Sequence, residues 1–378
     1  MNQLERLLDI SDYMVTFVRV AITGVSENVE IPDDFDWNAL YTLSEWHKLT
    51  VVVWKGVEMT GLKVPAPLYD KWYVRTQQAL SKSIRFEHEL RQIQTAFSKA
   101  GIDHVLLKGV TLQKYWPANF LREFSDHDIL IRAEHRETAR NVMLSLGYYN
   151  DHFGGVHDVY KKEPIYDVEI HVGLFEDVYD YAVFFQDVWN RVVLTNESLR
   201  QFSFASVDFY LYFLLHFIKH EKYMGSGLRF YIDLYVLRNQ LVFSKDEQRE
   251  ITSVLSTFGL LKYVEGFFEI TDSLFIDKKT IPAQMKELIF AGSVYGGHTQ
   301  SIYNSMHRYG TVRYVFRRLF PPRRELVHKY KFLEAYPFLL PAVWVYRLIH
   351  RFISGFHRKR IFREIRAVKR FSGKEVKK

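Results

Sequence analysis

The stretch GIDHVLLKGVTLQKYWPANFLREFSDHDILI, residues 101–131, carries the pattern that decides the fold. HVLLKG is a short apolar run that ends in glycine, which is typical of a buried strand. VTLQKYW suits a helix, and FSDHDILI predicts a second strand. An amphipathic helix follows and ends at Gly147, and residues 158–163 and 167–174 predict two further strands. This order predicts an α+β fold, with an α/β-type core whose small mixed sheet runs from about residue 102 to 175 and is flanked by helices.

Helical patterns lie on both sides of this core. Residues 72–100 contain no Pro or Gly and space Leu80, Ile84, Leu90, Ile93 and Phe97 at helical intervals, and a shorter helix is expected over 36–55. The helical period returns at Ser206. We therefore divide the chain into an N-terminal helical region (1–100), an α/β core (101–200), a helical domain (201–310) and a C-terminal tail (311–378).

The composition excludes several classes of site. None of the 378 residues is cysteine, so disulfides, thiolate nucleophiles, zinc–thiolate sites and iron–sulfur clusters are excluded. A reducing, cytoplasmic location is therefore expected. Charged residues interrupt any signal-peptide pattern near the N-terminus. The longest uncharged stretch near the other end, residues 335–346, has 12 residues and two prolines, whereas a bilayer span needs about 20 residues.

The tail differs from the rest of the chain in charge. From Thr311 onward there are 19 Lys and Arg residues against 4 Glu, a net charge of +15, whereas the remainder carries −8. Aromatic residues alternate with the basic ones in YRLIHRFISGFHRKRIF, which favours an amphipathic helix at an anionic membrane surface. A solvated helix packed against the acidic body explains the pattern equally well. No specific nucleic-acid-binding module is recognised.

The chemistry expected of the core begins with Asp126 and Asp128. Alternate side chains of a strand face the same way, so both aspartates project to one face and His127 to the other. Two such carboxylates can converge on one hard cation, and Mg²⁺ prefers one or two carboxylates together with substrate phosphates. Solvated charges at a strand end are the alternative interpretation of the same pattern.

A Lys-Gly turn stands upstream of the aspartates. Gly109 at a strand-to-helix turn would let backbone amides approach a phosphate, and Lys108 would offer a charge to the same group. Arg122 can neutralise a triphosphate in the same way. A turn glycine with solvent-exposed Lys and Arg side chains is the alternative.

The strand DVEIHV adds a third acidic position. Asp167, Glu169 and His171 share one face, and the apolar residues between them share the other. An apolar back and an acidic front are what a third metal ligand requires, although an edge strand with a polar face has the same pattern.

The helix pair after Ser206 supplies further candidates. His216 and His220 lie four residues apart on one helix face, a spacing that suits zinc, but the sequence offers no evident third ligand. We expect His220, Arg229 and Asp233 either to border the nucleotide pocket or to hold the helical domain against the core.

Taken in order, these motifs resemble the nucleotidyltransferase superfamily, and specifically the uncharacterised nucleotidyltransferase family that has Lys-Gly in place of the usual Gly-Ser. The resemblance rests on GIDHVLLKG, REFSDHDILI, EIH and HFIKHEKYMGSGLRFYIDL, and covers roughly residues 37–240. The chain departs from the family at two positions. Glu169 stands where Asp is usual, and His127 stands where an apolar residue is commoner.

The resemblance implies a metal-dependent transfer of a nucleoside monophosphate from a triphosphate, such as ATP, to a hydroxyl acceptor, with release of pyrophosphate. It implies Mg²⁺ or Mn²⁺ at the catalytic residues Asp126, Asp128 and Glu169. The implied nucleotide-binding residues are Lys108, Gly109, Arg122, His171, His220, Arg229 and Asp233. The alternative is an inactive nucleotide-binding protein or a membrane-surface adaptor. The acceptor is not specified, although the resemblance weakly suggests a bacterial surface-polysaccharide or secondary-metabolite pathway.

Overall fold

The computed structural model describes residues 3–223, 225–278, 310–327 and 330–353, together with 286–287, 289–290 and 306. The chain begins with four helices, α1 (Gln3–Thr23), α2 (Trp37–Trp46), α3 (Thr50–Thr60) and α4 (Ala66–Lys99), whereas the sequence predicts a helical region with helices over 36–55 and 72–100. The single helix expected over 36–55 is wrong. The chain turns between α2 and α3, where Lys48 adopts a φ of 55° that no α-helix accommodates.

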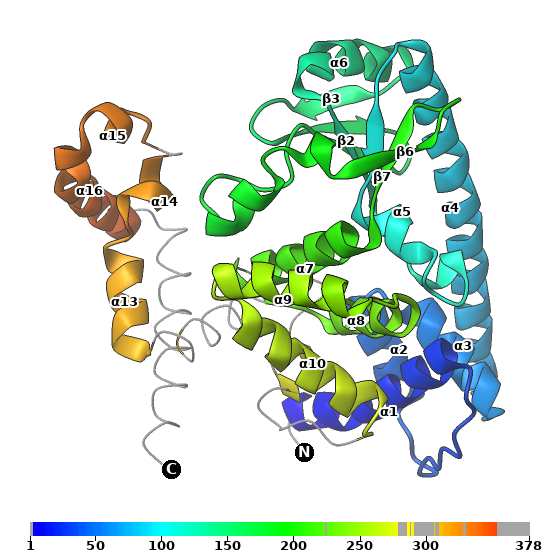
Figure 1. Ribbon diagram of the computed structural model, residues 1–378. Helices are drawn as coiled ribbons and strands as arrows, with labels where there is room; N and C mark the ends of the chain where they lie inside the picture. The colour runs from blue at the N-terminus through cyan, green and yellow to red at the C-terminus, as the bar shows by residue number, and fades with distance from the viewer. Residues whose placement is uncertain are drawn as a thin grey trace.

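Helix α4 runs along one side of the molecule from the N-terminal helices to the sheet (Figure 1). A proline in its first turn starts the helix, and Gly101, with a φ of 73°, follows its end. Leu90, Ile93 and Phe97 are buried, as their spacing predicts. This half of α4 therefore anchors the helix to the sheet. The prediction is wrong for Leu80 and Ile84, which are exposed, because α4 buries Ala79 and Phe86 in that part instead.

The sheet is mixed, and in the described residues it has seven strands in the order β3-β4-β5-β2-β1-β7-β6. The neighbours β2 and β5 are parallel, as are β1 and β7, and the other pairs are antiparallel. The strands are β1 (His104–Leu106), β2 (Asp126–Ile131), β3 (Tyr149–His152), β4 (His157–Lys162), β5 (Tyr166–His171), β6 (Val192–Asn196) and β7 (Gln201–Phe204). The mixed sheet is confirmed, but it extends to Phe204, well beyond residue 175. Strands β6 and β7 were not predicted, because their apolar patterns extend over only five and four residues.

The two faces of the sheet meet different helices. Ile129 and Ile131 of β2 pack with Val168 and Ile170 of β5 against α4 and against α6 (Arg136–Ser145). On the opposite face, Leu130 joins the larger core that contains the following helices. The period of two within each strand therefore separates an apolar back from the face that carries the acidic residues.

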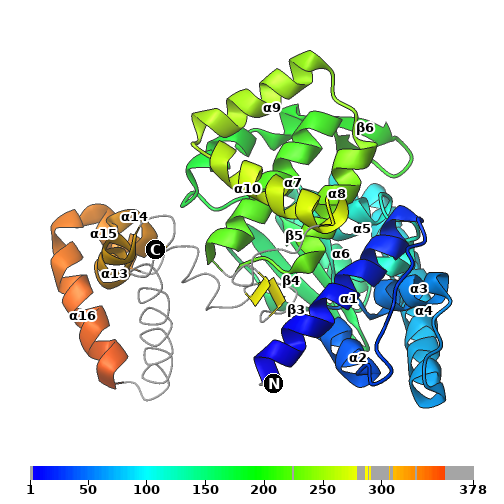
Figure 2. The same cartoon turned by 90° about the horizontal axis from the view of Figure 1, so that it is seen from below.

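Helices α7 (Ser206–Tyr223) and α8 (Leu228–Gln240) face that acidic side, and α9 (Lys245–Thr257) and α10 (Leu261–Phe275) complete the helical layer (Figure 2). A capping box of Ser244 and Glu247 starts α9. The large buried cluster contains side chains from Ile10 through Phe290 and so crosses the boundaries expected at residues 100 and 200.

The described part of the basic tail is helical and forms a separate lobe (Figure 1). It contains α13 (Thr311–Leu319), α14 (Arg323–Val327), α15 (Phe332–Ala335) and α16 (Leu340–Ile353). Residues 354–378 of the expected tail lie outside the described residues. None of the helices in the described part of the chain is long and apolar enough to cross a membrane.

Candidate active site

The parallel pairing of β2 with β5 brings the predicted acidic residues together. Asp128 and Glu169 are register partners across this pair. Because side chains alternate, Asp126, Asp128, Glu169 and His171 all project from one face of the sheet. Asp126, Asp128 and Glu169 line a cavity of about 390 Å³ between the sheet and helices α7 and α8.

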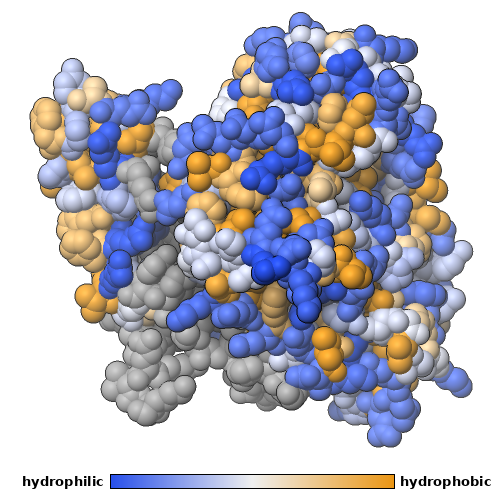
Figure 3. Space-filling model, viewed as in Figure 1, coloured by the Kyte–Doolittle hydropathy of each residue, from blue (hydrophilic) through white to orange (hydrophobic). Residues whose placement is uncertain are grey.

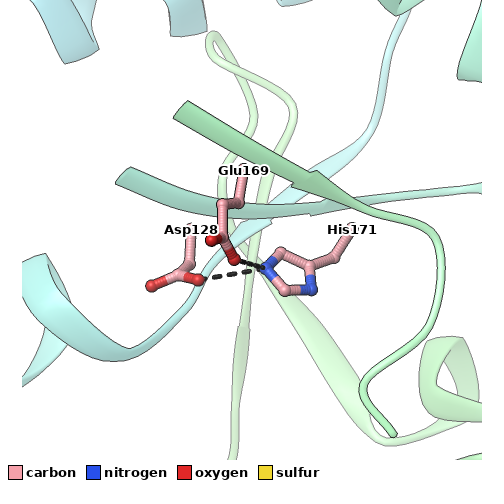
Figure 4. Close-up of side chains that lie close together, drawn as sticks. All are labelled: Asp128, Glu169 and His171. Carbon is pink, nitrogen blue, oxygen red and sulfur yellow. Dashed lines mark hydrogen bonds and ion pairs between the residues drawn. The ribbon is translucent and has the colours of Figure 1, made fainter. Parts of the chain in front are cut away.

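The closest contacts in the cavity join Asp128, Glu169 and His171. Figure 4 shows both carboxylates turned toward one ring nitrogen of His171. His171 Nε2 lies 3.0 Å from Asp128 Oδ1 and 3.3 Å from Glu169 Oε2. One ligand atom from each of the three residues lies within 4.8 Å of the others, so together they can hold a metal ion.

Lys108 balances the charge of Asp128. Its Nζ lies 2.8 Å from Asp128 Oδ1, and the Asp128 side chain is only 4% exposed. Burial alone would raise the pKa of Asp128, but Lys108 and His171 outweigh it and hold that pKa well below its usual range. Burial likewise opposes the charge of Lys108, yet Asp128 raises the pKa of the Lys108 amine. Both groups are therefore ionised at neutral pH.

The Lys-Gly turn differs from the sequence expectation in detail. Lys108, rather than Gly109, has the positive φ, at 24°. Such a conformation is uncommon for a non-glycine residue and is found at functional sites. Gly109 is required for space, because a Cβ there would lie 2.9 Å from the ring of Phe124.

Asp126 faces the same cavity but is not part of the tight cluster. Burial raises its pKa, as do the charges of Asp128 and Glu169, and Lys108 offsets only part of this rise. We predicted Asp126, Asp128 and Glu169 as the ligand set. In the structure His171 makes the closer contact with Asp128 and Glu169, because its ring nitrogen donates to carboxylates that would otherwise repel each other.

Arg122 and Asp233 form a buried clamp between the core and α8. Arg122 Nε and Nη2 donate to the two carboxylate oxygens of Asp233 at 2.7 and 2.8 Å, and Arg122 Nη1 donates to the carbonyl oxygen of Gly109. Trp116 Nε1 also donates to Asp233. Both residues of the clamp line the cavity, but their side chains are engaged with each other. Of the two roles expected for Asp233, these contacts favour holding the helical layer against the core.

The remaining predicted residues come from α7 and α8. His220 Nε2 lies 2.9 Å from His216 Nε2, and Arg229 Nη1 donates to the carbonyl oxygen of Glu123. All three residues line the cavity. In the described part of the chain, the only group of three or more potential metal ligands is Asp128, Glu169 and His171, so the histidine pair gains no third ligand for zinc.

Sequence reasoning missed two polar groups in the cavity, His157 on β4 and Lys219 on α7. The ring of His157 lies 5.1 Å from that of His171. Burial, with a further contribution from Lys108, lowers the pKa of Lys219. Within the described residues, no carboxylate lies within ion-pair distance of Lys219. In the sequence, Lys219 could have been predicted as a cavity residue because it is adjacent to the candidate His220 in HFIKHE.

An apolar wall completes the cavity. It is formed by Leu112, Phe124, Phe209, Tyr212, Phe213 and Phe230. The cavity therefore has an acidic side on the sheet, an aromatic side on the helices, and amines from Lys108 and Lys219.

The donor set fits a divalent cation. Asp126, Asp128 and Glu169 supply oxygen ligands of the kind that Mg²⁺ and Mn²⁺ prefer. Burial first, and then the charges of Asp128 and Glu169, raise the pKa of Asp126. A bound cation would offset the repulsion among the three carboxylates.

The α+β fold is consistent with that of a nucleotidyltransferase, and comparison with known families agrees. The family described as "Uncharacterised nucleotidyltransferase" matches residues 33–275, which include the whole sheet and helices α2–α10. Because the match covers more than half of the chain, the protein belongs to this family. A comparison with curated proteins gives no match. Family membership supports a nucleotidyl-transfer function and a nucleoside triphosphate substrate.

Proposed function

We propose that this protein transfers a nucleoside monophosphate from a nucleoside triphosphate to a hydroxyl acceptor and releases pyrophosphate, with Mg²⁺ or Mn²⁺ as cofactor. The observation that carries the proposal is the convergence of Asp126, Asp128 and Glu169 from two parallel strands on one cavity that also contains Lys108. Nucleotidyl transfer needs such a combination of cation ligands and phosphate-binding amines.

The acidic residues would hold the metal. Divalent cations bound to Asp126, Asp128 and Glu169 would neutralise charge on the phosphate oxygens and lower the pKa of the attacking hydroxyl. His171 contacts two of these carboxylates and would fix their orientation, as hydrogen-bonded neighbours of metal ligands do. We therefore assign His171 to positioning the ligands rather than to direct contact with the nucleotide.

The cationic residues would bind the triphosphate. Lys108 contacts Asp128 in the structure and would bridge from that carboxylate to a phosphate. Lys219 and Arg229 approach the cavity from the helical layer, so phosphate binding would draw the two sides of the cavity together. The Phe209 and Phe213 rings offer an apolar surface on which a nucleobase can pack.

The two departures from the family affect the site differently. His127 points away from the cavity and packs between Phe86 and Phe124, with ring centroids 5.1 and 5.4 Å away. Burial lowers its pKa to about 4, so it is a neutral core residue. Glu169, in contrast, lines the cavity. Only the departure at Glu169 therefore bears on catalysis.

The deciding experiment is a pyrophosphate-release assay on the full chain. Each of the four nucleoside triphosphates, labelled on the α-phosphate, would be incubated with Mg²⁺ and a cell lysate that supplies acceptors. We expect one triphosphate to be consumed and an acceptor to become labelled, and Asp126→Asn to abolish both signals. The matched control is Asp167→Asn, which changes a carboxylate on the same strand as Glu169 but outside the cavity lining.

The alternative, a nucleotide-binding protein without turnover, predicts a different result in the same assay. Metal-dependent triphosphate binding would be retained by the wild-type chain, while no pyrophosphate would be released and no acceptor labelled. That result would replace the transfer proposal with the binding one. An adaptor without any nucleotide site would show neither binding nor release.

We also propose that the protein acts in the cytoplasm, on the basis of its cysteine-free sequence. The four ranges 1–100, 101–200, 201–310 and 311–378 serve as a proposal for its organisation. A sugar or small-metabolite acceptor in a polysaccharide or secondary-metabolite pathway remains the suggestion of the family resemblance, and the lysate labelling would identify the acceptor directly.

A further inference from the structure

The C-terminal lobe lies beyond the part of the chain that matches the family, which ends at residue 275. The lobe has a small buried core of its own, formed by Leu326, Leu333 and Val343. Trp344 Nε1 donates to the carbonyl oxygen of Pro321 at 2.8 Å and ties α16 to the loop before α14. The lobe is therefore an ordered helical unit whose role the nucleotidyltransferase site does not explain.

Helix α13 has an exposed apolar stripe. Val312, Val315, Phe316 and Leu319 follow the spacing i, i+3, i+4 and i+7, so they lie on one face of the helix. Val312 is 85% exposed and Phe316 is 61% exposed. An apolar stripe on a helix normally packs against a core, yet within the described residues this stripe is not buried by any other element.

The other helices of the lobe extend the exposed apolar surface. Phe338, before α16, is 74% exposed, and Phe332, Tyr336, Val345 and Tyr346 are also exposed. Of the 25 exposed large hydrophobic residues in the described chain, nine lie between residues 312 and 346. Apolar residues gather visibly on this lobe in Figure 3. A concentration of this kind marks an interaction surface rather than chance exposure.

Positive charge flanks the same stripe. With 3.6 residues per turn, Arg313 and Arg318 lie on either side of the apolar face of α13, and Arg317 lies toward its back. Arg317 pairs with Glu325. The tail as a whole carries +15. Arginine side chains beside an apolar stripe can reach anionic headgroups while the stripe enters the boundary between headgroups and acyl chains.

We propose that the apolar stripe of α13 and its flanking arginines bind the surface of an anionic phospholipid bilayer. The positive charge and the exposed apolar residues together favour a bilayer over other anionic partners. Nucleic acid would use the arginines but would leave Val312 and Phe316 in water. The binding is interfacial, because none of the described helices is long and apolar enough to span a bilayer. It would hold the cavity near substrates or acceptors at the membrane.

The first test is sedimentation of the full chain with vesicles. Vesicles of phosphatidylcholine mixed with phosphatidylglycerol would be compared with pure phosphatidylcholine, at low and high salt. We expect binding to the anionic vesicles only, and weaker binding as salt screens the charges. Replacing Arg313 and Arg318 with Gln should weaken binding by about fivefold for each arginine. The control replaces the exposed Arg91 and Arg249 with Gln and should leave binding unchanged.

The apolar stripe is tested separately. The triple variant Val315→Gln, Phe316→Gln, Leu319→Gln should bind at least about tenfold more weakly. Its control replaces three exposed valines elsewhere, Val183, Val193 and Val242, with Gln. Thermal melting of each variant checks that the fold is retained. Equal binding by the stripe variant and its control would overturn the proposal, as would strong binding of an RNA oligonucleotide without any binding to vesicles.

The absence of cysteine allows a direct measurement of insertion. Phe316→Cys, labelled with an environment-sensitive fluorophore, should shift to shorter emission wavelength when anionic vesicles are added. The same label at Val242→Cys, a site 91% exposed on the body, should not shift. An unchanged signal at position 316, or an equal shift at both positions, would contradict the proposal. Because these readouts need no triphosphate, they are independent of the proposed transferase activity.

Discussion

The charges around Asp128 and Asp126 predict opposite effects of the same substitution at two neighbouring positions. Asp128 is buried and contacts Lys108 and His171, whereas Asp126 faces other carboxylates and has a raised pKa. From the sequence alone, both Asp→Asn changes would be expected to relieve repulsion and to maintain or raise stability without metal. The structure changes that expectation for Asp128, because its charge is already compensated.

The expected loss of stability in Asp128→Asn follows from the loss of its ion pair with Lys108. Asp128→Asn leaves a partly buried lysine without its counter-charge, and breaking such a pair costs about 3 kcal/mol of unfolding free energy. An unfolding entropy of about 2 cal/mol/K per residue converts this, for the whole chain, to a fall in Tm of about 4 °C. Asp126→Asn should leave the metal-free Tm unchanged or raise it by about 1 °C, since a carboxylate with like-charged neighbours is removed.

The assay is differential scanning calorimetry of both variants in excess EDTA, followed by the pyrophosphate-release assay in Mg²⁺. Both variants should lose activity by about 10²-fold or more, because metal stabilisation of the transition state is worth several kcal/mol. Mg²⁺ with triphosphate should raise the Tm of the wild type but of neither variant. A stable Asp128→Asn and a destabilised Asp126→Asn in EDTA would refute this account of the charges. Full metal-dependent turnover in either variant would show that the carboxylate is structural.

Four further predictions concern the cavity and its supports. Glu169→Asp restores the family's usual residue and should retain activity, whereas Glu169→Gln should lose it by about 10²-fold; equal loss in both would contradict this, because the site would then need the length of the glutamate side chain as well as its charge. Asp233→Asn leaves the buried Arg122 unpaired and should lower the unfolding free energy by about 3 kcal/mol, measured by urea denaturation, and an unchanged midpoint would contradict the clamp. Burial lowers the pKa of His104 from 6.5 to about 4, so its contribution to stability is complete above pH 6.5 and is lost as pH falls toward 4. Between pH 6.5 and 4 the unfolding free energy of the wild type should fall by about 3 kcal/mol more than that of His104→Gln. Identical pH dependence of the unfolding free energy in the two proteins would contradict this prediction. Lys219→Ala should raise the KM for the triphosphate by about tenfold, with kcat less affected, and an unchanged KM would remove Lys219 from the phosphate site.

The sequence by itself determined the elements that carry the chemistry. Alternation in DHDILI and DVEIHV placed Asp126, Asp128 and Glu169 on the polar faces of two strands, because a strand has a period of two whatever it pairs with. The glycine after HVLLK and the helical spacing of Leu90, Ile93 and Phe97 were equally local signals. The family motifs rest on the same short segments, which is why the family and the mixed sheet could be predicted from sequence.

The tertiary structure alone decided how those side chains pair. His171 meets Asp128 because β2 and β5 are parallel neighbours with Asp128 opposite Glu169, a register that neither strand specifies by itself. Arg122 turned out to contact Asp233, 111 residues away, and Lys219 entered the cavity from a helix that folds over the sheet. Strands β6 and β7 have only five and four residues, so their patterns are short, and their pairing with β1 and with each other fixes them in the sheet. Pairing and ionisation depend on distances between segments remote in sequence, and only the packed chain sets those distances.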